Sequence, residues 1–383
     1  MVEKKVFISG CFDCFHSGHA EFLRTAAELG DVYVSVGSDK NVYFLKEVKP
    51  TFTEKERRFI VSQIKGVKEA FVSKEMGKID FLEDLERIKP DIFVVNEEGH
   101  TKEKKRVCAE KGVEYIVLKR TPQEGLPIRS STELRSKTSR IPFRLDLCGG
   151  WLDQPYVSEV YPGPVITISI EPDSQFNFRS GMASSTRNKA ISLWQDNLPE
   201  EDPVHLAKVL FSFENPPGTR EKAIAGAQDA IGIAIPGIAY SFFDKEYWPK
   251  EIKQCSQEDV ISWLEDRIYL AELKPRGAEY SPFTGAQITT ENVKALSFAA
   301  EDCYKAILRK DFSQFANSVR KGFETQSALF PATFPDWINP VLQEYREQGA
   351  VGWKLSGAGG GGYLVLISEK PLKNTRKIHI RRK

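Results

Sequence analysis

Two histidines stand three residues apart in the segment Gly10–His19, whose sequence is GCFDCFHSGH. The segment follows a strand-like run and precedes the helical pattern AEFLRTAAELG, so His16 and His19 are expected in the turn that opens a helix. Both imidazoles can face one anion there, because a helix N-terminus presents unpaired amides and the positive end of the helix dipole. The spacing therefore predicts a phosphate site.

Cys11 and Cys14 allow a second interpretation of this segment. With His16 and His19 they have the pattern C-x2-C-x-H-x2-H, which could hold zinc. The other cysteines, at positions 108, 148, 255 and 303, are scattered and complete no second pair. We favour the phosphate site, and zinc stays an alternative.

Three further segments carry glycines where the backbone could approach a ligand closely. The run KLSGAGGGGYLVLI (354–367) has four consecutive glycines before a strand-like run. Far upstream stand RIPFRLDLCGGWLDQP (140–155) and SGMASST (180–186), the second directly before the helical pattern RNKAISLW. A single glycine-rich loop is weak evidence for a nucleotide site, but three such segments in one chain are stronger evidence.

The elements that must position the two histidines form an alternating pattern. From residue 1 to about 137, short β-rich runs alternate with amphipathic stretches, which predicts an α/β fold with a doubly wound parallel sheet. Thr53 and Glu56 form a capping box, and Gly30 and Gly112 stand where helices should end. Ligands of such sheets bind beyond the carboxyl ends of the strands, where the segment from Cys11 to His19 is expected.

The pattern changes near residues 136–141 (SKTSRI), so we predict one domain over residues 1–137 and a second over 138–383. The second part holds the strand-like run VITISI, a region from about Glu291 to Glu347 that is largely helical, and the glycine-rich run before YLVLI. This arrangement indicates an α+β domain rather than a second doubly wound sheet.

The composition narrows the class of protein. A chain of 383 residues with 41% hydrophobic and 28% charged residues is typical of a soluble globular protein of two or three domains, not of a disordered or fibrous chain. Lys and Arg number 54 against 53 Asp and Glu, so no net field favours nucleic acid or an anionic membrane as a partner. Any phosphate binding must be local.

We expect a cytoplasmic protein, because the run MVEKKVFISG lacks the apolar stretch and cleavage site of a secretory signal. The apolar segment Ala223–Tyr240 is expected as a buried helix and loop, since Gln228 and Asp229 lie inside it and Pro236 interrupts it. The basic tail RKIHIRRK is expected as a final strand with a solvated face.

Residues 1–137 resemble the nucleotidyltransferase superfamily of the cytidylyltransferase type. The resemblance rests on the HxGH segment, on Lys46, Pro50 and the pair Glu56-Arg57, and on Arg129–Arg135 (RSSTELR), which is similar to the family's ISSTxIR segment. It implies that a phosphate oxygen of the acceptor attacks the α-phosphorus of a nucleoside triphosphate and pyrophosphate leaves. No covalent nucleophile is needed, so catalysis is positioning plus charge neutralisation.

The resemblance also implies roles for single residues. His16 and His19 contact the triphosphate and the transition state, and Lys46 contacts the acceptor or the α-phosphate. The expected nucleotide-binding residues are Gly10, Phe12, Asp13, Gly18, Arg129, Ser130, Ser131, Thr132 and Arg135. Cytidylyltransferases favour CTP, whereas related adenylyltransferases share the same motifs, so ATP stays open. The segment Asn96–His100 stands where such a sheet places the base or the acceptor.

The three glycine-containing segments together resemble the GHMP kinase superfamily in its motif order. The form GGWLDQP followed by YPGPVITISI is similar to the fucokinase and heptose kinase branch, which implies a sugar substrate. The segment Ala227-Gln228-Asp229 resembles the branch's QDQ segment, so Asp229 is the expected catalytic residue. The alternative for Asp229 is a helix cap.

Further roles follow from this second resemblance. The amides of Gly181 to Thr186 would cradle ATP phosphates, and Ser184 or Ser185 would reach magnesium, with Glu214 as the nearest plausible acid. Arg144 and Asp153 are the expected sugar-side residues, and Trp151 offers an apolar face. The remaining expected nucleotide-binding residues are Ala183, Gly357, Gly359 and Gly360.

The chain departs from the kinase pattern in three places. Only Glu171–Arg179 separates VITISI from the middle segment, so part of the usual nucleotide-binding lobe is missing. The middle segment reads GMASST instead of GLGSSSA, and the magnesium-binding acid is not at its usual spacing before Asp229.

We therefore predict a bifunctional enzyme that uses ATP and Mg²⁺ to phosphorylate a sugar and then transfers a nucleotidyl group, with CTP favoured, to the sugar phosphate. Two alternatives stay open: only the transferase is active, acting on a polyol phosphate, or the chain is a sensor that binds nucleotide and sugar without turnover. A homodimer is possible, and neither nucleic acid nor a membrane is expected as a partner.

Overall fold

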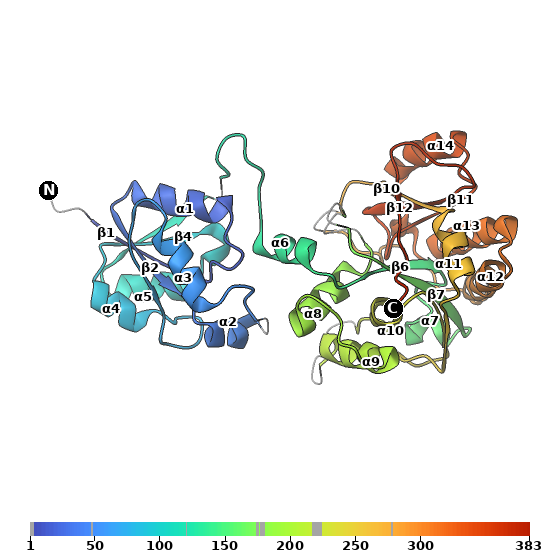
Figure 1. Ribbon diagram of the computed structural model, residues 1–383, viewed down its shortest axis with the longest axis horizontal. Coiled ribbons are helices and arrows are strands. Elements are labelled where there is room, and N and C mark those ends of the chain that lie inside the picture. Colours follow the sequence, from blue (N-terminus) through green and yellow to red (C-terminus); the bar gives the residue numbers. More distant parts are fainter. Residues whose placement is uncertain are drawn as a thin grey trace. The chain divides into compact units, whose positions relative to one another are not determined.

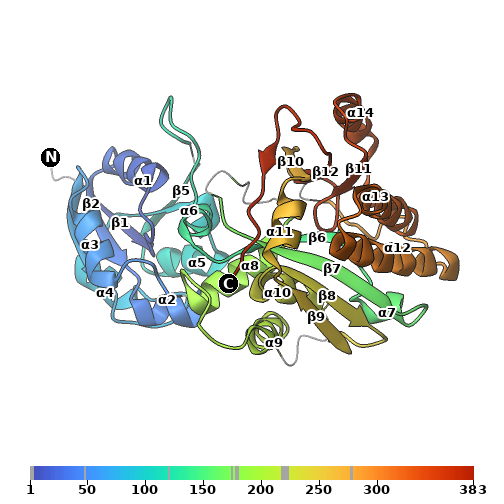
Figure 2. The same cartoon turned by 45° about the vertical axis from the view of Figure 1, so that its right-hand side comes forward.

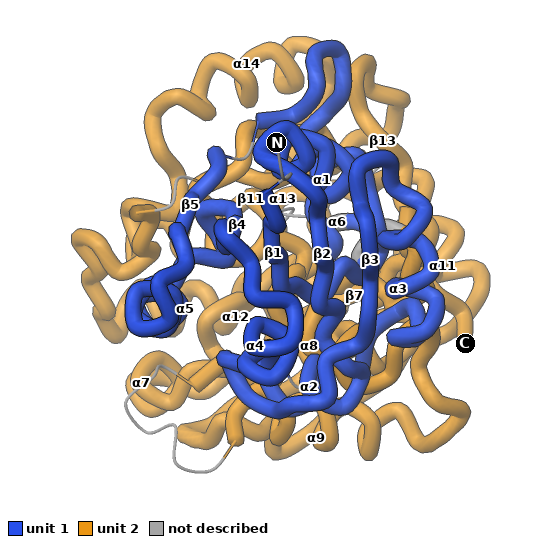
Figure 3. Tube along the Cα trace, turned by 90° about the vertical axis from the view of Figure 1, so that its left-hand side faces the viewer, with its two compact units in different colours: residues 1–136 blue, residues 137–383 orange. Residues whose placement is uncertain are grey.

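The computed structural model describes residues 4–46, 49–119, 121–173, 176, 181–216, 224–276 and 279–383. Ser180, the first residue of the SGMASST segment, lies outside these ranges, as does most of the stretch from 174 to 179. The chain forms two compact units, residues 1–136 and residues 137–383 (Figure 3). Each unit has its own sheets and its own core.

The first unit is built on a five-stranded sheet in the order β3-β2-β1-β4-β5, in which every neighbouring pair is parallel. The strands are β1 (Lys5–Gly10), β2 (Asp31–Val36), β3 (Val67–Val72), β4 (Ile92–Asn96) and β5 (Glu114–Leu118). The helices are α1 (Ser17–Ala27), α2 (Asp39–Lys46), α3 (Glu54–Ser62), α4 (Leu82–Ile88), α5 (Lys102–Glu110) and α6 (Ser131–Thr138).

Helices cover both faces of this sheet (Figure 1). Val6 and Ile8 of β1 pack into a cluster with Leu23 of α1 and Val61 of α3, whereas Phe7 packs into a second cluster with residues of α4 and α5. Alternate residues of one strand thus enter opposite cores, as a strand with two covered faces requires. The prediction of a doubly wound α/β sheet is confirmed.

Arg57 ties together the loops at the carboxyl end of this sheet. Its guanidinium is completely buried and donates to the carbonyl oxygens of Cys11 (2.5 Å), Gly37 (2.9 Å) and Phe52 (3.0 Å). It also pairs with the Asp39 carboxylate at 2.6 Å. In the Glu56-Arg57 pair singled out in the sequence, Arg57 is therefore a structural residue, whose N–H donors are matched by surrounding acceptors.

The second unit has two four-stranded sheets whose pairings are all antiparallel, in the orders β6-β7-β8-β9 and β11-β12-β10-β13. Their strands are β6 (Phe143–Cys148), β7 (Gly163–Ile170), β8 (Ile238–Phe243), β9 (Glu251–Cys255), β10 (Ile268–Glu272), β11 (Gly352–Leu355), β12 (Tyr363–Ile367) and β13 (Arg376–Lys377). The α+β prediction is confirmed.

Eight helices accompany these sheets in the described part of the unit: α7 (Pro155–Ser158), α8 (Ser184–Trp194), α9 (Pro203–Glu214), α10 (Ala227–Ala234), α11 (Glu258–Glu265), α12 (Thr290–Arg309), α13 (Phe312–Leu329) and α14 (Asn339–Glu347). The long helices α12 and α13 lie side by side in Figures 1 and 2 and pack with β6, β7, β10 and β12 in one core.

One expectation needs correction. The segment expected as buried helix and loop contains α10, but its end belongs to strand β8, because Ile238–Phe243 pairs with β7. The basic tail pairs as expected, through strand β13 and a bridge from Ile380 to Ile170, and it has one solvated face, because Ile378 and Ile380 are buried while Lys377 and His379 are exposed. No helix in the described ranges combines the length and apolar character needed to cross a membrane.

We expect Arg57→Ala to destabilise the first unit by about 3–5 kcal/mol, because removing one partner leaves buried acceptors and a carboxylate without their donor. Urea unfolding would measure the loss, and hydrogen exchange of the β1 amides would assign it to this unit. The matched control is Arg58→Ala, which changes an exposed neighbour on the same helix and should shift stability by less than about 0.5 kcal/mol. Equal stability of the two variants would contradict the role of Arg57.

Candidate functional site

A cavity of about 710 Å³ lies at the carboxyl ends of the parallel strands in the first unit. It is lined by nearly all the residues that the sequence singled out here, namely Gly10, Phe12, Asp13, His16, Gly18, His19, Lys46, Ser130, Ser131, Thr132 and Arg135. Arg129 is not part of its lining. The segments around His16, Lys46 and Ser131 therefore meet in one place, while the roles of their residues stay predictions.

The two histidines lie face to face at the start of α1. Their ring centroids are 4.0 Å apart with an interplanar angle of 21°, and Phe12 contacts the His19 ring edge-on. His16 is the N-cap of the helix, and its Nδ1 accepts a hydrogen bond from the Gly18 N–H at 3.1 Å. In the neutral ring the proton then sits on Nε2, which can donate to a phosphate oxygen.

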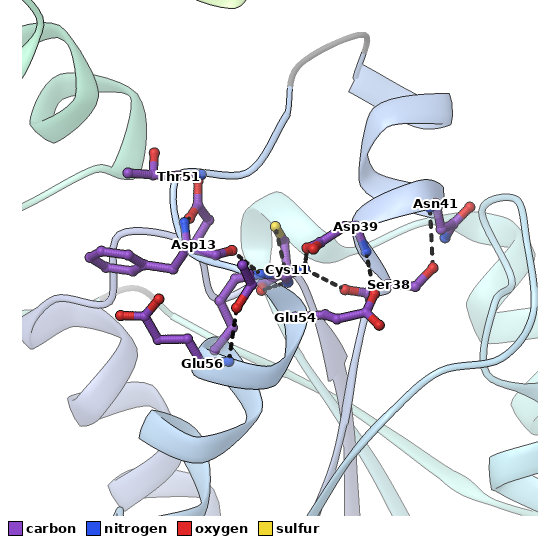
Figure 4. A network of polar contacts seen from close by, with 12 residues as sticks. Cys11, Asp13, Ser38, Asp39, Asn41, Thr51, Glu54 and Glu56 are labelled. Carbon is purple, nitrogen blue, oxygen red and sulfur yellow. Dashed lines mark hydrogen bonds and ion pairs between the residues drawn. The ribbon is translucent and has the colours of Figure 1, made fainter. Parts of the chain in front are cut away.

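Asp13 holds several parts of this cavity together (Figure 4). Its carboxylate accepts from the backbone N–H groups of Thr51 and Phe52, both at 3.0 Å, and from Arg135 Nη1 at 2.7 Å. Its backbone carbonyl accepts from Ser131 Oγ at 2.7 Å. Burial alone would raise the pKa of Asp13, but these donors hold it below its usual value. Asp13 thus positions Arg135 and Ser131.

Sequence reasoning missed further polar residues of the cavity, among them Asn41, Asp80 and Lys104. Asn41 Nδ2 donates to Asp80 Oδ2 at 2.7 Å, and burial raises the pKa of Asp80. Burial likewise lowers the pKa of Lys104. These residues come from three different elements and belong to no motif, so no local pattern could have identified them.

The cysteines of the zinc alternative make other contacts. Cys14 Sγ donates to Thr51 Oγ1 at 3.3 Å, and burial raises the pKa of the Cys14 thiol, which disfavours the thiolate that a metal needs. Among the described residues no group of three or more His, Cys, Asp or Glu side chains is arranged to hold a metal ion.

A second cavity, of about 230 Å³, lies in the second unit. Its lining combines residues from all three glycine-containing segments with the Gln-Asp segment, including Arg144, Trp151, Asp153, Ser185, Thr186, Glu214, Asp229 and Gly357. Gly181, Ala183, Ser184, Gly359 and Gly360 were also singled out but do not line it. Segments far apart in the chain therefore converge around Asp229.

Asp229 is held between a cation and a hydroxyl. Arg144 Nη2 donates to Asp229 Oδ1 in an ion pair, and Thr186 Oγ1 lies 3.5 Å from Asp229 Oδ2. The residue that caps α10 is Gly226, and Asp229 lies in the first turn of that helix. The helix-cap alternative for Asp229 is therefore wrong.

Glu214 fits a divalent cation. Its Oε1 accepts from Thr186 Oγ1 at 3.0 Å, while its Oε2 is buried and has no hydrogen-bond partner among the described residues. Burial raises the pKa of Glu214, and a bound cation would keep the carboxylate ionised. Hard oxygen ligands of this kind, one carboxylate with hydroxyls beside it, suit Mg²⁺ that is bound mainly through nucleotide phosphates.

Two glycines allow the middle and last segments to touch. Gly181 has φ +71° and Gly357 has φ +60°, conformations that favour glycine. A Cβ on Gly181 would lie 2.7 Å from the Ser356 carbonyl oxygen, and one on Gly357 would lie 2.2 Å from the Gly181 carbonyl oxygen. The two loops therefore contact each other backbone to backbone next to the start of α8.

Asp153 and Trp151 also line this second cavity. Asp153 is 1% exposed, its Oδ1 accepts from Gln228 Nε2 at 3.0 Å, and burial raises its pKa to about 7. Trp151 has φ +83°, unusual for a bulky residue, and its ring stacks on Phe330 at 4.3 Å. Backbone strain of this kind is typical of ligand sites.

Comparison with known proteins gives a separate result for each unit. Residues 7–137 match the family model described as cytidylyltransferase-like, and residues 303–378 match the one described as GHMP kinases C terminal. An FAD synthase of Ferroglobus placidus is 33% identical over 134 residues, which cover 34% of this chain and 85% of that protein.

A second related protein and a solved structure are similar to other parts of this chain. The bifunctional protein HldE of Helicobacter pylori (strain P12) is 39% identical over 94 residues, so the match covers 24% of this chain and only 20% of HldE. Among solved structures, a D-glycero-D-manno-heptose 1-phosphate kinase of Bacteroides thetaiotaomicron has a TM-score of 0.40 and 15% identity, covering 63% of this chain and 94% of that one.

The raised pKa of Asp153 predicts a pH dependence of stability. An unfolded aspartate loses its proton near pH 4, whereas folded Asp153 keeps it until about pH 7, so the free energy of unfolding falls as pH rises between these values. We expect Asp153→Asn to remove about 2–3 kcal/mol of the decrease that the wild type shows between pH 5 and pH 8. Chemical unfolding at each pH would measure it.

The control for this prediction is Asp196→Asn, which changes an exposed aspartate of the same unit. Its free energy of unfolding should depend on pH as that of the wild type does. The explanation from Asp153 is excluded if Asp153→Asn keeps the full decrease.

Proposed function

We propose a function from one premise: the chain belongs to the cytidylyltransferase-like family through residues 7–137. It also carries a GHMP kinase C-terminal domain at residues 303–378, and the two domains make it an enzyme. Its second unit phosphorylates a hydroxyl of a sugar with ATP. Its first unit then transfers a nucleotidyl group to the sugar phosphate and releases pyrophosphate.

The observation that carries this proposal is that segments far apart in the chain meet in one cavity around Asp229. Arg144 binds Oδ1 of the Asp229 carboxylate, which leaves Oδ2 to accept a proton from the sugar hydroxyl. The hydroxyl oxygen forms the new bond to the γ-phosphorus, the bond from that phosphorus to the bridging oxygen breaks, and ADP leaves. Mg²⁺ held by Glu214 with Ser185 or Thr186 would neutralise phosphate charge.

In the first unit, an oxygen of the acceptor phosphate attacks the α-phosphorus and the bond to the bridging oxygen of pyrophosphate breaks. The attacking oxygen is already ionised, so the site needs no general base. His16, His19 and Lys46 supply donors to the charged transition state, and Arg135 with Ser131 holds the leaving pyrophosphate.

CTP is the nucleotide that we favour, on the resemblance to cytidylyltransferases. The similarity to a protein named FAD synthase makes ATP the competing donor, because FAD contains adenine. We keep a cytoplasmic location and the use of Mg²⁺ as parts of the same proposal.

The decisive experiment mixes the full chain with ATP, CTP, Mg²⁺ and one sugar of a panel, with no sugar phosphate added. The panel contains D-mannose, D-galactose, L-fucose, D-glycero-D-manno-heptose and glycerol, each with and without CTP. Mass spectrometry should detect a nucleotide-linked sugar for at least one member. A sugar phosphate that accumulates and is never consumed with any nucleoside triphosphate would contradict the coupling of the two units.

We further expect one substitution in each unit to remove one activity only. Asp229→Asn should lower ATP-dependent sugar phosphorylation by at least about 10²-fold, the effect of losing a general base. His19→Ala should lower pyrophosphate release by about 10²-fold, since a donor to developing charge contributes about 3 kcal/mol. ADP formation from the sugar and pyrophosphate release from added sugar phosphate are assayed separately on both variants, so each variant is the control for the other. Loss of both activities in a folded variant would contradict two separate sites.

A further inference from the structure

Asp146, which lines the smaller cavity, belongs to a buried ion pair. Lys354 Nζ lies 2.6 Å from Asp146 Oδ2, and both side chains are 2% exposed. Asp146 comes from β6 and Lys354 from β11, which belong to different sheets of the second unit. Neither residue was singled out in the sequence, and the chemistry proposed above uses neither.

Only one oxygen of the Asp146 carboxylate has a hydrogen-bond partner among the described residues. Its Oδ1 atom is buried and has no hydrogen-bond partner among the described residues, although Asp146 lines the cavity. A buried carboxylate oxygen needs a donor, because desolvation without one is costly. Lys354 Nζ donates to Oδ2 and not to Oδ1. Because Asp146 lines the cavity, a ligand bound there can supply the donor that Oδ1 lacks.

The other polar atoms of the cavity define the kind of donor. Among the described residues that line it, Asp146, Asp153, Glu214 and Asp229 are acidic and Arg144 is the one cation. The amide oxygen Oε1 of Gln228 is also buried without a partner among the described residues. The unpartnered atoms of Asp146 and Gln228 are acceptors, which a hydroxyl group can satisfy and an ionised phosphate cannot.

We propose that Asp146 Oδ1 accepts a hydrogen bond from a hydroxyl of the sugar that is phosphorylated in this cavity, and that Lys354 positions the carboxylate for it. This inference rests on the proposed kinase function and makes Asp146 a determinant of sugar specificity. The part of the sugar that meets Asp146 carries free hydroxyls and no phosphate.

The pair could instead be a purely structural link between two sheets, so the test must separate the two roles. The double variant Asp146→Asn with Lys354→Met removes both charges and leaves no unpaired ion. The matched control is Asp259→Asn with Lys310→Met, the same chemical change in an exposed ion pair of the same unit. Initial rates of ADP formation are measured with the panel sugar that the wild type phosphorylates best, and melting temperature reports folding.

We expect the Asp146 double variant to fold and to raise KM for the sugar by about 10- to 100-fold, the range for losing a hydrogen bond to a charged group. KM for ATP should change less than about twofold, and the control should match the wild type in both constants. A folded Asp146 double variant with the wild-type KM for the sugar overturns the inference.

A second measurement keeps the inference testable if that variant fails to fold. On the wild type, monodeoxyfluoro analogues of the sugar replace one hydroxyl at a time with fluorine, which cannot donate. At least one position should raise KM by about tenfold or more, and equal KM values throughout overturn the inference. A wild type that phosphorylates no member of the panel overturns the proposed kinase function itself, an outcome visible before any variant is assayed.

Discussion

The Arg57 guanidinium is the interaction on which the first unit's cavity depends. It fixes the carbonyls of Cys11 and Phe52, which belong to the loop before His16 and to the segment before α3. The amides of Thr51 and Phe52 in turn bind Asp13, and Asp13 binds Arg135 and Ser131. A single buried cation thus helps to set the positions of Asp13 and Ser131, which lie more than one hundred residues apart in the chain.

In the second unit, too, buried cations fix the positions of carboxylates. Arg144 orients Asp229, and Lys354 fixes Asp146, so each of the two cations holds one oxygen of a carboxylate and leaves the other oxygen to the cavity. Buried ion pairs contribute little net stability, but breaking one is strongly destabilising, so their effect here is to define geometry. The carboxylates are thereby presented to a ligand in one orientation.

Local patterns predicted much of this arrangement. Strand and helix alternation identified the parallel sheet, and the positions of His16, His19 and Asp229 followed from segments in which chemistry-bearing residues lie close in sequence. Asp146 and Lys354 could not be found in this way, because 208 residues separate two partners that meet only after two sheets have packed. The same holds for Asp80 and Lys104, whose importance comes from the cavity they share. On α8 the pattern could not choose between adjacent hydroxyls: Ser184 or Ser185 was expected to reach the metal, and of these two only Ser185 lines the cavity, next to Thr186.

The contact between Gly181 and Gly357 has a consequence for how this sequence can change over evolution. Each glycine leaves room for the carbonyl group of the other loop, so a side chain at either position would push the two loops apart. Neither position can accept a larger residue unless the opposite loop is rebuilt at the same time. The two loops must therefore change together or not at all, although they lie far apart in the chain.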